Sequence, residues 1–185
     1  MKTAITKKQY EEIYELLNSV EILDFDCGTL CSAACCTHEG TEEMGIYLLP
    51  GEEAVHEDDH DWLDFRIEKA EDHYMPESWS GEVYFVRCKT PPFCPREKRP
   101  IQCRTFPLAP HIDSDGELTL IYNDMELPYK CPLIEEAIPL NDDYYDATLE
   151  AWQRLIEDPL IYDLVRMDSE AREDSFLELM DKLGI

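Results

Sequence analysis

The chain has 185 residues, 44% of them hydrophobic, which is enough for one well-buried core. Sixteen basic and forty-two acidic residues give a formal net charge of −26. Such a charge repels nucleic-acid phosphates and anionic membranes, so neither is expected as a partner, while a protein partner is left open. No apolar run approaches about 18 residues, and the first residues lack the apolar region of a signal peptide. These features predict a cytoplasmic protein that folds as a single domain over residues 1–185.

The first expected element is a helix over residues 7–18. Thr6 and Gln9 have the spacing of a capping box, in which each side chain bonds the backbone of the other residue. Apolar residues then recur at helical spacing, namely Tyr10, Ile13, Tyr14 and Leu17. A segment dense in cysteine, residues 27–38, follows this N-terminal part.

The middle of the chain indicates a small, irregular sheet. Short strands are expected at residues 46–49, 65–67 and 82–88, with a helical turn or two over residues 52–61. The prolines between positions 91 and 110 predict a loop without regular structure, because proline lacks a backbone donor and restrains the residue before it. A turn at residues 114–116 predicts a hairpin that pairs residues 111–113 with residues 117–122.

A helical pattern begins at Asn141 and is interrupted by Pro159. Two further helices are expected over residues 160–167 and 169–183. This tail, residues 141–185, holds thirteen acidic and four basic residues, which is typical of a solvated outer face.

Eight cysteines are the strongest functional signal in the chain. A reducing cytosol disfavours structural disulfides, whereas metal and redox chemistry use thiols directly. The alternatives are a disulfide framework and free cysteines that serve as small buried apolar residues. Four cysteines within ten positions are not what scattered core residues would give, so metal ligation by thiolates is the prediction. The candidate ligands are Cys27, Cys31, Cys35, Cys36, Cys88, Cys94, Cys103 and Cys131.

Helix geometry limits how the first four cysteines bind metal. In one unbroken helix, Cys27 and Cys35 would lie about 12 Å apart along the axis. The ligands of one zinc ion lie only about 4 Å from each other. Either Gly28 opens the start of the segment into a loop, or the ligands divide between metals. The adjacent pair Cys35 and Cys36 favours division, because neighbouring helical side chains diverge by about 100°.

We therefore expect sulfurs from residues 27–36 and from residues 88–131 to share sites. Eight thiolates fit two four-coordinate metal sites or one polynuclear cluster with bridging sulfurs. The spacing does not match the ferredoxin runs. Zinc and iron, including iron in an iron–sulfur cluster, both stay open.

The cysteine pattern resembles a known family. Cys27-x3-Cys31-x3-Cys35-Cys36 is followed by Cys94 and then by Arg99-Pro100-x2-Cys103-Arg104-x-Phe106-Pro107-Leu108. This pattern is similar to that of the YkgJ-type cysteine-cluster proteins, a zinc- or iron-chelating domain family with eight cysteines, and to the cluster-bearing part of flagellin lysine-N-methylases. The resemblance covers roughly residues 27–131 and leaves out the helical tail. It implies metal binding but no particular reaction, so enzymatic activity is left open, as are a redox or electron-transfer role and an accessory role in a methylase-like enzyme.

A basic stretch surrounds three of the candidate ligands. Residues 87–104 contain six basic residues and one acidic residue. Nearby positive charge favours thiolate over thiol and offsets the negative charge of a thiolate-ligated metal. The simpler alternative is that these basic side chains form ion pairs with the acidic remainder. Arg99 and Arg104 flank Cys103, so we expect them to orient this ligand and to act as cofactor-binding residues.

Two histidine candidates are weaker. His56-Glu57-Asp58-Asp59-His60 matches the zinc-protease motif H-E-x-x-H. The acidic residues around it indicate a solvated face, so we predict that it is not a catalytic zinc site. His38 lies two residues after Cys36, where a histidine ligand is an alternative to a polar loop residue. We expect an α+β fold in which proline-rich loops and a small sheet enclose a cysteine metal centre, with a helical C-terminal part packed against it.

Overall fold

The computed structural model describes residues 2–37, 44–125 and 127–183, and it has an α+β fold. Its helices are α1 (Lys7–Asn18), α2 (Gly28–Cys31), α3 (Ala34–Thr37), α4 (Ile101–Thr105), α5 (Pro132–Glu135), α6 (Asp142–Leu155) and α7 (Pro159–Leu183). Short 3-10 turns are η1 (Glu52–Val55), η2 (Ala70–Asp72) and η3 (Arg96–Lys98). The strands are β1 (Ile46–Tyr47), β2 (Leu63–Lys69), β3 (Glu82–Cys88), β4 (Leu108–Ile112) and β5 (Leu118–Tyr122).

Two small antiparallel sheets form the β part. In the first, β3 lies between β1 and β2, with Val86 paired to both Ile46 and Phe65. The second is the hairpin of β4 and β5, in which Leu108 pairs with Tyr122. The expected strands and hairpin are confirmed, although β2 is longer than predicted and β1 is shorter.

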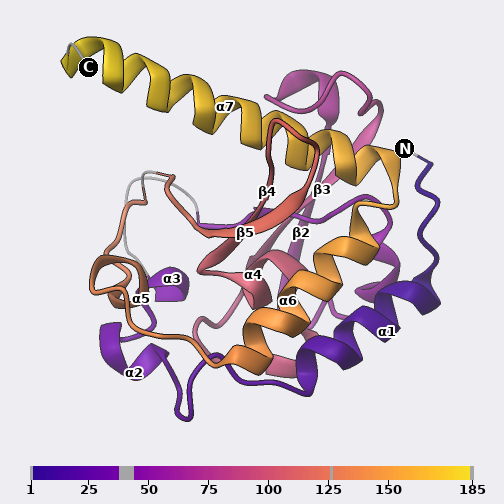
Figure 1. Ribbon diagram of the computed structural model, residues 1–185. Helices are drawn as coiled ribbons and strands as arrows, with labels where there is room; N and C mark the ends of the chain where they lie inside the picture. Colours follow the sequence, from indigo (N-terminus) through magenta and orange to yellow (C-terminus); the bar gives the residue numbers. More distant parts are fainter. Residues whose placement is uncertain (1, 38–43, 126, 184–185) are drawn as a thin grey trace.

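The main core lies between the hairpin and the helices α1, α6 and α7, which Figure 1 shows packed around the sheets. Helix α1 has the predicted bounds, and the capping box of Thr6 and Gln9 is present. Its buried residues, Tyr10, Ile13, Tyr14 and Leu17, are the four that the helical spacing indicated. Ile101 brings the start of α4 into the same core.

Two predictions about regular structure were wrong. The proline-rich segment is not a continuous loop, since η3, α4 and β4 all lie between residues 91 and 112. Pro100 caps α4, and Pro110 lies in a two-stranded sheet, where an unpaired backbone position is available to it. The two helices expected over residues 160–167 and 169–183 are a single helix, because α7 continues unbroken from Pro159 to Leu183. In Figure 1, the far end of α7 extends away from the rest of the fold.

The described residues include no helix that is both long and apolar enough to cross a membrane.

Asp158 joins the N-terminal segment to the start of α7. Its side chain is 1% exposed and accepts hydrogen bonds from the Thr3 hydroxyl at 2.7 Å and from the Ala4 amide at 2.5 Å. The other carboxylate oxygen accepts from the Leu160 amide at 2.9 Å, one of the unpaired amides at the helix start. Pro159 fits the first helical position, because that position needs no amide donor.

We predict that Asp158→Ala lowers the free energy of unfolding by about 2 kcal/mol, since a buried cap and its charged hydrogen bonds are lost together. Urea denaturation measures this change. The matched control is Asp163→Ala on the same helix, where the ion pair with Arg166 is 3.9 Å long. The control is expected to stay within about 0.5 kcal/mol of the unchanged protein. Equal losses in both variants would contradict the role given to Asp158.

Candidate functional site

The cysteine segment is broken into two short helices. Helix α2 ends at Cys31, and Ser32 and Ala33 both have a φ of 55°, in the left-handed region, before α3 begins. Non-glycine residues rarely adopt this conformation, and they keep it only where their surroundings enforce it. The break therefore lies after Cys31, whereas Gly28, the position expected to open the segment, is the first residue of α2. The distance limit of an unbroken helix does not apply.

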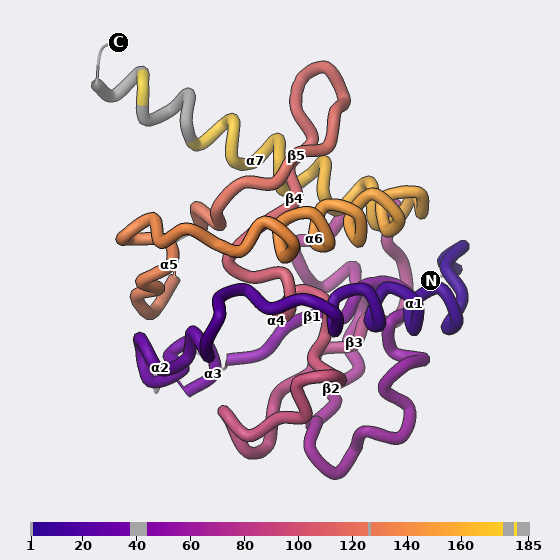
Figure 2. The backbone as a smooth tube through the Cα atoms, turned by 60° about the horizontal axis from the view of Figure 1, so that its bottom comes forward, coloured from indigo at the N-terminus to yellow at the C-terminus, as the bar shows by residue number. Residues whose placement is uncertain are grey.

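Helices α2, α3 and α5 lie together at one end of the molecule in both Figure 1 and Figure 2. This placement brings the first cysteine segment close to Cys131, which immediately precedes α5. Cys27 packs in the same small apolar cluster as Cys131. All eight cysteines are free thiols, so the structure contains no disulfide framework.

A first thiol group joins Cys36 to the proline-rich region; its members are Cys36, Cys88, Cys94 and Cys103. Cys88 and Cys94 pack against the same apolar cluster and are joined by a hydrogen bond. The pKa of Cys88 is raised first by this bond, then by burial and by the negative charges of Cys94, Cys103 and Cys36. The four sulfurs are thus close enough to act on one another electrostatically.

A second thiol group consists of Cys27, Cys31, Cys35 and Cys131. Burial raises the pKa of Cys27, and the negative charges of Asp26, Cys31 and Cys131 raise it further. Cys35 belongs to the group because the charges of Cys31 and Cys27 act on it, after its hydrogen bond with Cys36 and burial. Each group therefore mixes cysteines from the two sequence segments, as the sequence predicts for shared sites.

The adjacent residues Cys35 and Cys36 connect the two groups. Their sulfurs are 3.8 Å apart, so the expected divergence of neighbouring helical side chains does not separate them. The hydrogen bond between the two thiols is the first cause of the raised pKa of Cys35 and of the lowered pKa of Cys36. Tyr129 lies beside both groups: burial raises its pKa, as do the charges of Cys35, Cys131 and Cys103. In the sequence, only its position two residues before Cys131 could have indicated that Tyr129 lies near the thiols.

Arg99 is the basic residue that contacts a sulfur directly. Its Nε donates to Cys94 Sγ at 3.0 Å rather than to Cys103, the ligand that it was expected to orient. The pKa of Cys94 lies below its ordinary value, first because of the hydrogen bond from Cys88 and, against the effect of burial, because of Arg99. Arg104 donates instead to backbone and side-chain oxygens, among them the Arg99 carbonyl at 2.6 Å. Arg104 therefore holds the backbone that carries Arg99.

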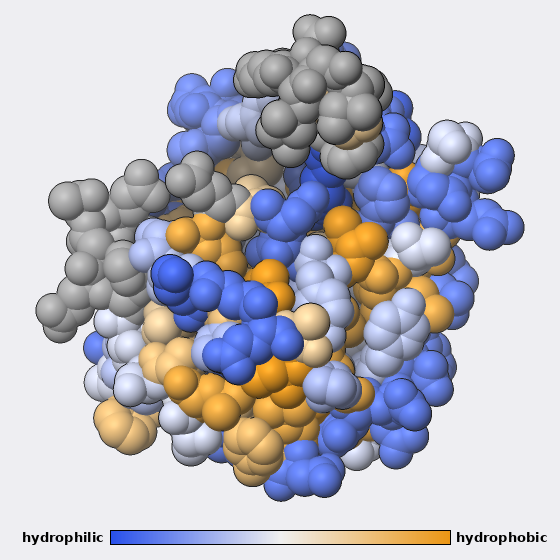
Figure 3. Space-filling model, turned by 60° about the vertical axis from the view of Figure 1, so that its left-hand side comes forward, coloured by the Kyte–Doolittle hydropathy of each residue, from blue (hydrophilic) through white to orange (hydrophobic). Residues whose placement is uncertain are grey.

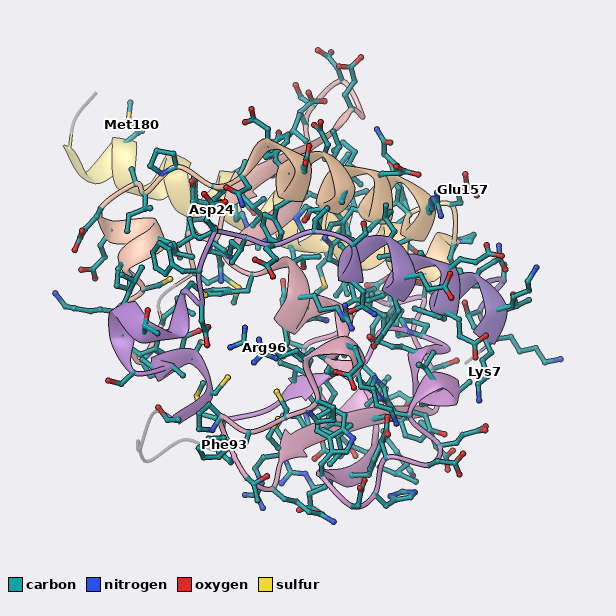
Figure 4. All side chains as sticks on the ribbon, turned by 90° about the horizontal axis from the view of Figure 1, so that it is seen from below. Lys7, Asp24, Phe93, Arg96, Glu157 and Met180 are labelled. Carbon is teal, nitrogen blue, oxygen red and sulfur yellow. The ribbon has the colours of Figure 1, made fainter. Side chains whose placement is uncertain are left out.

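Acidic and apolar residues complete the surroundings of the thiols. Arg96 is ion-paired with Asp26, and in Figure 4 Arg96 reaches into the region between α2–α3 and α4, which sulfur atoms border. The hydrogen bond from Arg96 is the main reason that the pKa of Asp26 lies below its ordinary value. Figure 3 shows an exposed hydrophobic area on this side of the molecule. Phe93, next to Cys94, is 82% exposed, and Phe25, near Cys27, is 52% exposed.

The sulfurs lie near one another, but they do not converge on one point that a metal ion could occupy. Across residues 2–37, 44–125 and 127–183, no three Cys, His, Asp or Glu side chains are arranged to hold a single metal ion. The donor set fits a soft metal in type and number, since all eight donors are free thiols. Closure of either group around a metal would require its side chains to move toward each other. His38, the alternative ligand, lies outside the described residues.

The first histidine of the H-E-x-x-H motif is part of a buried polar network. His56 Nδ1 lies 3.0 Å from Asp59 Oδ2, and its Nε2 lies 2.9 Å from the Tyr14 hydroxyl. That hydroxyl donates its single proton to Glu52 Oε1 at 2.6 Å. Both ring nitrogens of His56 therefore have partners within the protein.

An imidazole whose two nitrogens are both engaged in hydrogen bonds has no free lone pair for a metal. The second histidine, His60, is exposed and has its ring 4.8 Å from that of Phe65. Burial would raise the pKa of Asp59, but the hydrogen bonds from Lys98 and His56 hold it below its ordinary value. His56 and Asp59 are 0% and 2% exposed, so the solvated face expected for this motif is wrong for these two residues, which belong to a buried hydrogen-bonded network.

No protein-family model matches the chain, and no curated protein or solved structure is significantly similar to it.

We predict that Arg99→Gln raises the pKa of Cys94 in the metal-free protein, because the substitution removes a cation and its N–H donor from the thiolate. Alkylation of Cys94 should then begin at higher pH and be slower at pH 7, which mass spectrometry of the labelled peptide measures. Arg166→Gln on α7 removes the same charge far from the thiols and should leave the profile unchanged. An unchanged Cys94 profile in Arg99→Gln would contradict the assigned contact.

Proposed function

We propose that this protein binds metal through cysteine thiolates, with the first and second thiol groups as two separate ligand sets. The observation that carries the proposal is the gathering of sulfurs that are distant in sequence. Cys36 lies near Cys88, Cys94 and Cys103. Cys131 lies near Cys31 of α2 and near Cys27, the residue before α2. Eight free thiols in two sets of four match the ligand count of two tetrahedral metal sites.

The charges around the first thiol group support the same proposal. Four thiolates around a divalent ion leave a net negative charge, which needs compensation when the site is partly removed from water. Arg99 supplies an N–H donor and a positive charge at Cys94. Three other basic residues of this stretch form ion pairs with carboxylates, as the simpler alternative expects: Arg87 with Asp64, Arg96 with Asp26 and Lys98 with Asp59. The compensation of negative charge at the sulfurs is therefore argued from Arg99.

Zinc and iron would give these thiol groups different functions. Zinc would serve as a structural or stored ion, because it has no redox chemistry. Iron in an iron–sulfur cluster would give a redox or electron-transfer component. The 3.8 Å separation of the Cys35 and Cys36 sulfurs favours this second function as the alternative, because it is close to the spacing of ligands at one metal centre and so suits a single polynuclear cluster. Either function requires a reducing compartment such as the cytoplasm, where the thiols stay free.

Metal and sulfide analysis of anaerobically purified protein separates these functions. A colourless protein with two equivalents of zinc and no inorganic sulfide would support the structural or storage function. A brown protein with iron and inorganic sulfide would support the redox function. A protein purified without either metal that also fails to take up zinc, or iron with sulfide, would overturn the proposal.

We predict that Cys94→Ser and Cys131→Ser each lower the bound metal by about half, because each substitution removes one ligand from only one thiol group. The double variant should bind almost no metal. Elemental analysis of protein that has been gel-filtered after loading measures the stoichiometry. Ser114→Ala, at an exposed turn far from the thiols, is the control for handling losses. Loss of all metal from either single variant would instead indicate one polynuclear cluster.

We also predict that metal loading stabilises the fold, since a ligand that binds only the native state adds its linkage free energy to unfolding. The gain should reach roughly 4 kcal/mol when free zinc exceeds its dissociation constant about a thousandfold. Denaturant unfolding with zinc and with excess chelator measures the difference. Equal unfolding curves under the two conditions, with zinc bound at the start, would show that binding is not coupled to the native fold.

A further inference from the structure

The Glu52 carboxylate is buried beside the first thiol group and has three donors. It is 0% exposed and accepts from the Tyr14 hydroxyl at 2.6 Å, the Ile101 amide at 2.7 Å and the Leu49 amide at 3.0 Å. A buried carboxylate is tolerated only when its oxygens are satisfied in this way. Its donors come from α1, from the segment after β1 and from α4, so Glu52 fixes these three segments relative to each other.

One connection runs from Glu52 to Cys103. Ile101 is the first residue of α4, and its amide would otherwise be an unpaired donor at the helix start. The Ile101 side chain is fully buried in the main core, whereas Cys103, two residues later, is exposed. Glu52 therefore sets the position of the short helix from which Cys103 extends.

A second connection runs from Glu52 to Cys94. Tyr14, whose hydroxyl donates to Glu52, has the Arg104 guanidinium over its ring, 4.6 Å from the ring centre. Arg104 Nε donates to the Arg99 carbonyl at 2.6 Å, and Arg99 Nε donates to Cys94 Sγ at 3.0 Å. Both cysteines of the proline-rich segment that belong to the first thiol group are thus connected to the same carboxylate.

The hydrogen-bonded network around Glu52 extends through Tyr14 to a second buried carboxyl group, that of Asp59. His56 lies within hydrogen-bond distance of both Tyr14 and Asp59, and Lys98 donates to the other oxygen of Asp59. A buried network whose members bond one another specifies one arrangement of the groups around it.

We propose that Glu52 is a positioning residue for the first thiol group, which it holds through the start of α4 and through Tyr14, Arg104 and Arg99. This inference rests on the proposed metal binding and goes beyond it, because it assigns the geometry of one group to a residue that touches no sulfur. Outer contacts of this kind change metal affinity by about 10- to 100-fold when they are removed. The second thiol group has no such connection to Glu52 among the described contacts.

The test uses two pairs of matched variants in the full chain. Glu52→Gln keeps the side-chain size but turns an N–H₂ group toward a backbone donor, and Glu53→Gln removes the same charge one residue later. Tyr14→Phe and Tyr10→Phe each remove one buried hydroxyl bond from α1, but the Tyr10 hydroxyl donates to the Pro50 carbonyl, outside the network. The second pair keeps the test valid if Glu52→Gln fails to fold.

Co²⁺ is the probe, because its visible spectrum reports thiolate coordination. Affinity for the first thiol group is measured in a Cys131→Ser background, and affinity for the second in a Cys94→Ser background. We expect Glu52→Gln and Tyr14→Phe to weaken Co²⁺ binding by the first thiol group about 10-fold and to change its spectrum. Binding by the second group should stay unchanged, and so should both groups in Glu53→Gln and Tyr10→Phe. Equal weakening of both groups, or equal effects in a variant and its control, would overturn the inference.

Hydrogen exchange of the metal-free protein separates this inference from the proposed function. Glu52→Gln should reduce the protection of the amides in α4, while Glu53→Gln should not. If the unsubstituted protein binds no metal but α4 loses protection in Glu52→Gln, the proposed metal binding is wrong and the positioning of Cys103 by Glu52 is supported. If metal binds with full stoichiometry and α4 keeps its protection, the proposed function stands and this inference fails.

Discussion

The buried carboxylate of Glu52 is the constraint on which the arrangement of this fold depends. A charge without water must have donors, and here they are supplied by three segments that are far apart in the sequence. The condition fixes α1, the end of the first sheet and α4 in one arrangement. The main core then packs on one side of this junction, through Ile101. The thiols lie on the other side, so the polar junction separates the part that supplies stability from the part that carries the chemistry.

The two thiol groups depend on chain topology more than on local spacing. Cys35 and Cys36 are adjacent and their sulfurs are 3.8 Å apart, yet Cys35 feels the charges of Cys31 and Cys27, whereas Cys36 acts on Cys88. The left-handed turn at Ser32 and Ala33 separates α2 from α3 and allows the segment to face Cys131 as well as the proline-rich region. Arg99 then compensates charge at Cys94, where the pKa is already below its ordinary value. Local strain and long-range packing together define the candidate site.

The sequence predicted features that depend on neighbouring residues and missed those that depend on distant ones. Helix α1 was predictable from its capping box and apolar spacing, and β3 from its alternation of side chains. The continuity of α7 was missed. Pro159 lies at the start of this helix, and no local signal in residues 160–183 shows that the helix continues without a break. Cysteine count and spacing indicated the candidate ligands, but not their grouping. The role of Glu52 could not be predicted, because nothing in the sequence distinguishes the one of forty-two acidic residues that is buried at this position.

The order in which the cysteines occur along the chain has a consequence for biosynthesis. During translation, the first thiol group is complete once Cys103 has left the ribosome, and the second only after Cys131 has followed. In the proposed arrangement, a nascent chain would fill its metal sites in that order, and the early cysteines of residues 27–36 would wait, unligated, until these later cysteines have been made. The N-terminal helix α1 waits longer still, because its partner α6 is made after both groups. Completion of both thiol groups would therefore precede folding of the main core.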